Sequence, residues 1–139
     1  MRRVELNKAV ILTMMDAARE ARENAYAPYS NFKVGAAVMG GSGKVYLGCN
    51  VENASYGLTM CAERVAILKA ICEGERRLKA VVIVAGENSI ARPCGACLQT
   101  ISEFSLPEDP TVIVAASADL TYDVGTLDDY LPMRFSLKQ

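Results

Sequence analysis

The chain has 139 residues, of which 51% are hydrophobic and 22% are charged, a balance that predicts a single globular domain over residues 1–139. Its formal net charge is −1, and without clustered Lys and Arg we expect no nucleic-acid partner. The 0 histidines exclude Ser-His-Asp and Cys-His catalysis, so any metal site must be built from Cys, Asp and Glu.

Hydropathy along the chain bears on its location. Charged and polar residues follow Met1 where a secretory signal would be apolar, and no apolar run approaches the roughly 18 residues of a membrane span. We therefore expect no membrane partner and a cytoplasmic location. There, the five cysteines are expected as thiols and metal ligands rather than as disulfides.

Periodicity predicts a helix at residues 6–25, where apolar residues recur with a spacing near 3.6. Two strands are expected at residues 34–39 and 44–49, joined by a tight turn in which Gly40, Gly41 and Gly43 can take positive φ. Phe32 precedes the first strand. It could be a core aromatic or a wall of a substrate pocket.

The second half of the chain alternates helices and strands. This order implies an α/β fold with parallel pairing at the centre of the sheet through right-handed crossovers, and ligands in such sheets bind where strands end and the next helices begin. The expected elements are a helix at 61–73 ending near Gly74, a buried strand at 80–85, a helical pattern at 98–104, a strand at 111–116, an edge strand at 122–125 and a short helix at 127–131.

Two cysteine stretches stand at predicted helix starts, Cys61-Ala62-Glu63-Arg64 and Pro93-Cys94-Gly95-Ala96-Cys97. Helix N-termini carry partial positive charge and favour thiolate over thiol. Three Cys ligands leave one position of a tetrahedral zinc open, which is the catalytic pattern. Glu63 lies beside a ligand and could then move protons. Cys49 and Cys72 are expected to be buried apolar residues.

Other interpretations of the cysteines remain open. A Cys-x-x-Cys pair can be a redox dithiol, but here a third cysteine heads a second helix with a carboxylate beside it. A structural zinc site would need a fourth protein ligand, for which Cys49 is the only plausible candidate.

A polar segment, Asn50-Val51-Glu52-Asn53, follows the second strand. Such residues usually form a loop. In extended chain, however, the amide of Asn50 and the carboxylate of Glu52 point the same way and could hold one hydroxyl as donor and acceptor together.

The two cysteine stretches resemble those of the cytidine deaminase family, in its small branch with three cysteine ligands. The similarity extends over nearly the whole chain. It includes Tyr29-Ser30-Asn31-Phe32-Lys33-Val34-Gly35-Ala36-Ala37 before and in the first strand, Gly48-Cys49-Asn50-Val51-Glu52-Asn53-Ala54 after the second, and Leu131-Pro132 with Phe135 near the end.

The resemblance implies a three-layer α/β/α sandwich with a mixed five-stranded sheet, one Zn²⁺ per subunit, and a homotetramer with composite active sites. It implies hydrolysis of cytidine and/or deoxycytidine to uridine or deoxyuridine plus ammonia, as in pyrimidine salvage. Cys61, Cys94 and Cys97 would bind the metal, Glu63 would transfer protons, and Arg64 would support the sulfurs. The free nucleoside would meet Phe32, Asn50, Glu52, Ala54, Tyr56, Ala62 and, from a neighbouring subunit, Phe135.

Two departures from the family pattern concern the second cysteine stretch. Arg92 stands where Ser is common. Leu98 stands where Arg is usual, which removes one cation near the zinc cysteines and makes the positive charge of Arg64 more important. Two alternatives remain, a zinc deaminase for another aminopyrimidine nucleoside of the blasticidin S type, and a non-catalytic zinc-binding scaffold.

Overall fold

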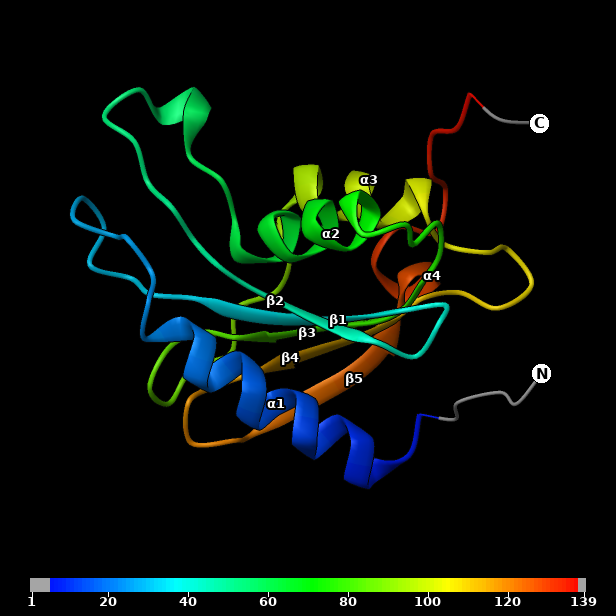
Figure 1. Cartoon of the computed structure of the whole chain (residues 1–139), viewed down its shortest axis with the longest axis horizontal. Coiled ribbons are helices and arrows are strands. Elements are labelled where there is room, and N and C mark those ends of the chain that lie inside the picture. The colour runs from blue at the N-terminus through cyan, green and yellow to red at the C-terminus, as the bar shows by residue number, and fades with distance from the viewer. Residues whose placement is uncertain (1–5, 138–139) are drawn as a thin grey trace.

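The computed structural model describes residues 6–137, which form a mixed five-stranded sheet between two layers of helices (Figure 1). Helix α1 covers one face, and α2 and α3 cover the other. The expected α/β sandwich is thus confirmed. The elements are α1 (Lys8–Arg22), β1 (Gly35–Gly40), β2 (Val45–Cys49), the 3₁₀ turn η1 (Tyr56–Leu58), α2 (Ala62–Cys72), β3 (Leu78–Val84), α3 (Gly95–Glu103), β4 (Val112–Ala116), β5 (Tyr122–Thr126) and α4 (Leu127–Tyr130).

The strand order is β2-β1-β3-β4-β5. Among the five described strands, only β3 and β4 pair in parallel, because β1 lies between β2 and β3 and runs antiparallel to both. The predicted crossover through α2 therefore skips one strand, and the parallel centre of the sheet is narrower than expected. Antiparallel β5 closes the other edge, where the sequence predicted an edge strand.

Helix α1 is shorter than predicted. It begins after Asn7, whose Oδ1 accepts a hydrogen bond from the Val10 amide at 2.9 Å, and it ends at Arg22 rather than at residue 25. Beyond it the chain turns, and Tyr26 forms an isolated parallel bridge with Val51. That bridge joins the segment before β1 to the segment after β2.

A hydrophobic core fills each side of the sheet. Side chains of α1, including Met14, Met15 and Ala18, pack on one face, and α2, α3 and α4 pack on the other. The central strand β3 is buried on both faces, as its run of β-branched residues predicted. No helix in residues 6–137 has the length and apolar character to cross a membrane.

Gly48 brings α2 close to the edge strand β2. A Cβ at this position would lie 2.6 Å from the Ala66 amide nitrogen and 2.7 Å from the Ala62 carbonyl oxygen. Only glycine permits this approach without moving the backbone. The start of α2, which holds Cys61 and Glu63, is thereby seated directly on the sheet.

Candidate metal and active site

Two helix N-termini bring three thiols together. Cys61 caps the start of α2 and Cys94 caps the start of α3, while Cys97 lies within the first turn of α3. The three sulfur atoms all lie within 4.8 Å of one another, and Cys94 Sγ is 3.5 Å from Cys97 Sγ. Cys97 is buried, Cys61 is half-buried and Cys94 is exposed, so the cluster opens to one side.

The sulfur geometry fits a zinc ion. Zinc–sulfur bonds of about 2.3 Å place ligand sulfurs about 3.8 Å apart in a tetrahedral site, close to the separations found here. Zinc prefers such thiolate donors. A hydrogen bond from Cys97 and the charge of Arg64 lower the pKa of Cys61 to about 5, while that hydrogen bond and burial raise the pKa of Cys97.

Arg64 lies in the first turn of α2 and points toward the cluster. Its Nη2 is 3.6 Å from Cys61 Sγ, and this contact raises the pKa of Arg64. Its Nε is buried and has no hydrogen-bond partner among the described residues. Leu98, where family members usually have Arg, is 8% exposed and belongs to the core below α2 and α3. Arg64 thus supplies a positive charge at the sulfur cluster, and Leu98 supplies none.

Glu63 is a buried carboxylate beside the thiols. It is 6% exposed, and its burial raises its pKa above the ordinary value. A raised pKa brings a carboxyl group closer to the pH at which an enzyme works, and such a group is a better proton-transfer catalyst. The position suits a residue that transfers protons.

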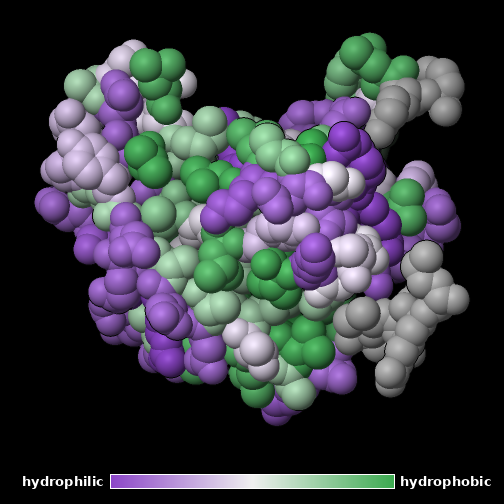
Figure 2. Space-filling view, in the orientation of Figure 1, coloured by the Kyte–Doolittle hydropathy of each residue, from purple (hydrophilic) through white to green (hydrophobic). Residues whose placement is uncertain are grey.

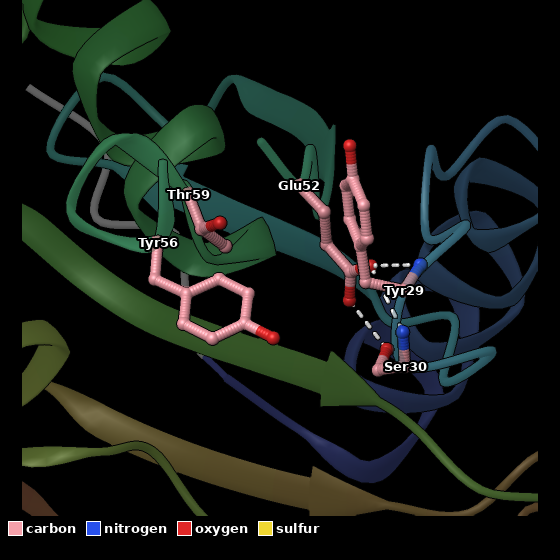
Figure 3. A pocket seen from close by; sticks show the side chains of 5 residues that line it. All are labelled: Tyr29, Ser30, Glu52, Tyr56 and Thr59. Atoms are coloured by element: carbon pink, nitrogen blue, oxygen red, sulfur yellow. Dashed lines mark hydrogen bonds between the residues drawn. The ribbon is translucent and has the colours of Figure 1, made fainter. Parts of the chain in front are cut away.

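A cavity of about 270 Å³ opens in front of these groups. It is lined by four of the seven residues that the resemblance implied for substrate, namely Phe32, Asn50, Glu52 and Ala62, and by Glu63, Cys61 and Cys94. Glu52 also lines a second cavity of about 300 Å³, together with Tyr29, Ser30, Tyr56 and Thr59 (Figure 3). The two cavities share Ser30, Glu52 and Thr59.

Three of the implied substrate residues lie outside the first cavity. Tyr56 is 79% exposed in η1 and lines only the second cavity. Ala54 is exposed in the loop before it. Phe135 is 66% exposed, and its carbonyl oxygen accepts a hydrogen bond from Gln99 Nε2 at 3.3 Å. The chain does not fold these three onto the pocket that contains Glu63.

The amide of Asn50 and the carboxylate of Glu52 both bind backbone. Asn50 Oδ1 accepts from the Val34 amide at 2.8 Å, and its Nδ2 donates to the Phe32 carbonyl at 2.9 Å. Glu52 accepts hydrogen bonds from the amides and hydroxyl of residues 29–30. The pair thus fastens the segment before β1 to the segment after β2. The spacing of these residues along the chain did not predict this contact or the part of Ser30 in it.

The structure also gives the positions of Arg92, Cys49 and Cys72. Arg92 lies at the rim of the first cavity, and its guanidinium forms an ion pair with Asp123 on β5. Cys49 is half-buried, whereas Cys72 is exposed, so the prediction of a buried Cys72 was wrong. Cys72 is the last residue of α2, where the helix leaves the sheet.

The fold and the site together define a class, that of α/β proteins in which a three-thiol zinc site opens into a cavity beside a buried carboxylate. A sequence model of the cytidine and deoxycytidylate deaminase zinc-binding region matches residues 9–115. The cytidine deaminase of Sporosarcina psychrophila is 43% identical over 119 residues, 86% of each chain. That of Halalkalibacterium halodurans is 44% identical over 125 residues, 88% of this chain and 92% of its relative.

Structural comparison agrees. The crystal structure of cytidine deaminase from Burkholderia pseudomallei superposes with a TM-score of 0.83 at 42% identity and covers 94% of this chain and 100% of the other. This chain belongs to the cytidine and deoxycytidylate deaminase family, and Cys61, Cys94 and Cys97 form a cluster suited to holding its zinc ion.

Proposed function

We propose that this chain catalyses the hydrolytic deamination of cytidine, deoxycytidine or both, giving uridine or deoxyuridine and ammonia. The observation that carries the proposal is the buried carboxylate of Glu63 beside the three thiols, in a cavity of about 270 Å³. A free nucleoside suits this cavity, since its described lining has one cation, Arg92, already paired with Asp123. A phosphate group would need more positive charge.

The chemistry requires two proton transfers. Zinc, when bound by Cys61, Cys94 and Cys97, supplies an activated water for attack at C4 of the cytosine ring. Glu63 accepts a proton from the water and delivers it to ring N3. It then takes the remaining proton of the former water from the C4 hydroxyl and transfers it to the amino group, so that the C4 carbonyl forms, the C4–N bond breaks and ammonia leaves. With 0 histidines in the chain, a carboxylate must perform both transfers.

The rest of the cavity would bind the nucleoside. Phe32 forms a wall for the base, and the backbone at Ala62 borders the ring. Asn50 and Glu52 would hold the 3′-hydroxyl of the sugar, Asn50 as donor and Glu52 as acceptor. Both side chains are held by backbone hydrogen bonds, which supports a pre-formed sugar site.

We further propose a homotetramer in which each active site uses residues of a neighbour. Two projecting segments support this. The segment around η1, with Ala54 and Tyr56, and the C-terminal segment carry exposed hydrophobic side chains, including Leu58 at 67%, Met133 at 94% and Phe135 at 66%. Figure 2 shows hydrophobic surface on both projections. Such patches are typical of interfaces.

We extend the proposal to the chain as a whole. Residues 1–139 would act as a single catalytic domain. A cytoplasmic location is supported by five cysteines that are all free thiols in the structure, and a role in pyrimidine salvage is supported by the family's reaction.

Ammonia release tests the function. Purified protein loaded with zinc is incubated separately with cytidine, deoxycytidine and blasticidin S. Ammonia release is measured, and so is the fall in absorbance of the aminopyrimidine. We expect turnover of at least one of the two plain nucleosides. Turnover of blasticidin S alone would assign another aminopyrimidine substrate, and no turnover of any of the three would indicate a zinc scaffold.

A further inference from the structure

Ser30 lies at the centre of a hydrogen-bond chain that ends on Glu52. The Phe32 amide donates to Ser30 Oγ at 3.0 Å. Because an amide can only donate, the oxygen of Ser30 is the acceptor there, and its own proton is directed to Glu52 Oε2. Asn31 between them has φ of +57°, a left-handed conformation that Asn tolerates well. This turn therefore fixes the direction of the hydrogen bonds, which run from the Phe32 amide to Ser30 and from Ser30 to Glu52.

Backbone amides also donate hydrogen bonds to the carboxylate of Glu52. Its Oε1 accepts from the amides of Tyr29 at 2.9 Å and Ser30 at 3.1 Å, as Figure 3 shows. Each carboxylate oxygen has two acceptor positions. Oε1 therefore uses both, whereas Oε2 has one donor among the described residues, Ser30. Glu52 lines both cavities, so the second acceptor position of its Oε2 is available to a ligand there.

The same arrangement recurs at the other end of β1 and β2. Ser42 donates its amide and hydroxyl to Glu75, and the Lys44 amide donates to Ser42 Oγ at 3.2 Å. Gly43 has φ of +93°, matching Asn31. There, however, the second position on Oε2 is filled, because Tyr46 Oη donates to it at 2.8 Å. Glu75 is buried and Glu52 is not.

We propose that Ser30 is a positioning residue for substrate. It holds Glu52 so that the free position on Oε2 accepts the hydroxyl of a ribose-type sugar, which takes the place that the Tyr46 hydroxyl has at Glu75. This inference rests on the proposed deamination and assigns to Ser30 a part in reading the sugar. Ser30 acts on the substrate through Glu52, so its effect appears in substrate affinity and not in the chemical step.

The ionisation of Glu52 gives a second consequence. The hydroxyl of Ser30 lowers the pKa of Glu52 below its ordinary value, with help from the amides of Ser30 and Tyr29. Glu52 then remains an acceptor at acidic pH. Without the hydroxyl its pKa rises, so that protonation removes the acceptor at a higher pH than in the wild type. The carboxylate is partly open to solvent, and no described charged side chain forms an ion pair with it.

The experiment compares Ser30→Ala, Ser30→Thr and the matched control Ser42→Ala with the wild type. For each, kcat and KM are measured with cytidine and with 3′-deoxycytidine, which lacks the hydroxyl. Ser30→Ala should raise KM for cytidine about tenfold with little change in kcat and should leave KM for 3′-deoxycytidine within about twofold of wild type. Ser30→Thr should retain the wild-type KM because it keeps the hydroxyl.

The control separates positioning from folding. Ser42→Ala removes an equivalent hydroxyl far from the cavities, so it should lower the melting temperature without changing KM for either nucleoside. The ratio of kcat/KM for cytidine to that for 3′-deoxycytidine is then followed from pH 7 to pH 4. This ratio cancels the titration of Glu63, and its acid-side fall should begin at higher pH in Ser30→Ala.

Equal losses on both nucleosides, or a loss in kcat alone, would overturn the assignment, as would an unchanged KM for cytidine. The wild type decides the proposed function separately. Ammonia release by the wild type with an unaffected Ser30→Ala leaves deamination standing and rejects the role of Ser30, whereas a wild type that releases no ammonia rejects deamination itself.

Discussion

The two ends of the cavity are built in different ways. At the metal end, the side chains come from the first turns of α2 and α3 and rest on a core in which Ala62, Ala66 and Ile101 are fully buried. At the sugar end, Glu52 comes from an extended loop and is held by hydrogen bonds to another loop. The difference teaches that the reacting centre depends on helix packing within one chain, while substrate recognition depends on segments that remain partly exposed.

This contrast predicts a gradient of mutational effects. Substitutions at the metal end should abolish binding of the ion or the chemical step. Substitutions at the sugar end should weaken affinity for particular substrates, and those at the exposed projections should have the smallest effects.

The largest effect is expected from Cys94→Ala. Loss of one of three thiolates should release the zinc and reduce turnover to background, because zinc then lacks a ligand that the remaining donors cannot replace. Metal analysis by mass spectrometry after dialysis checks this. Cys72→Ala is the control and should retain one zinc per chain, since Cys72 is exposed at the far end of α2. Full zinc in Cys94→Ala would contradict the ligand assignment.

The next effect is expected from Glu63→Gln. The amide has nearly the shape of the carboxylate but cannot carry a proton, so zinc should remain while kcat falls by about 10²–10⁴. Zinc content and steady-state turnover are measured on the same preparation. Near-wild-type turnover would show that Glu63 only stabilises the first turn of α2, where a carboxylate also interacts favourably with the helix dipole.

Glu52→Ala should have a smaller effect, confined to sugar recognition. Loss of the acceptor should cost about 1–3 kcal/mol in kcat/KM, which is roughly 5- to 150-fold, for cytidine and deoxycytidine alike. A 3′-deoxy analogue should be spared, since it lacks the hydroxyl. Because Glu52 also binds the backbone at Tyr29 and Ser30, the melting temperature is measured in parallel. Equal losses on all three substrates would mean that Glu52 acts through the loop.

The smallest effect is expected from Phe135→Ala. In the proposed tetramer the ring meets the pyrimidine of a neighbour, and such an aromatic contact contributes about 0.5–1.5 kcal/mol beyond its buried area, so KM should rise several-fold. Light scattering gives the oligomeric state. Mixing Glu63→Gln subunits with Phe135→Ala subunits should restore some sites that have both Glu63 and a neighbour's Phe135. A fully active monomer would contradict the composite site.

The sequence predicted the parts of the site that depend on local rules. Helix starts at Cys61 and Cys94 follow from the apolar pattern after each cysteine stretch, and a helix start orients its first side chains whatever it packs against. The buried strand near residues 80–85 follows from its β-branched run. The position of β1 between β2 and β3 did not follow, because strand order along a chain leaves open which neighbours pair.

Contacts between distant segments were decided by the tertiary structure. Sequence alone determined that three thiols, a carboxylate and an arginine occur at two helix starts, and that their spacing is that of a zinc deaminase. Only the fold brought Ser30 to Glu52, paired Arg92 with Asp123 and left Cys72 exposed. Each of these depends on which side chains of remote segments come within hydrogen-bond reach or leave the core, and the periodicity of a single segment carries no information about its partner.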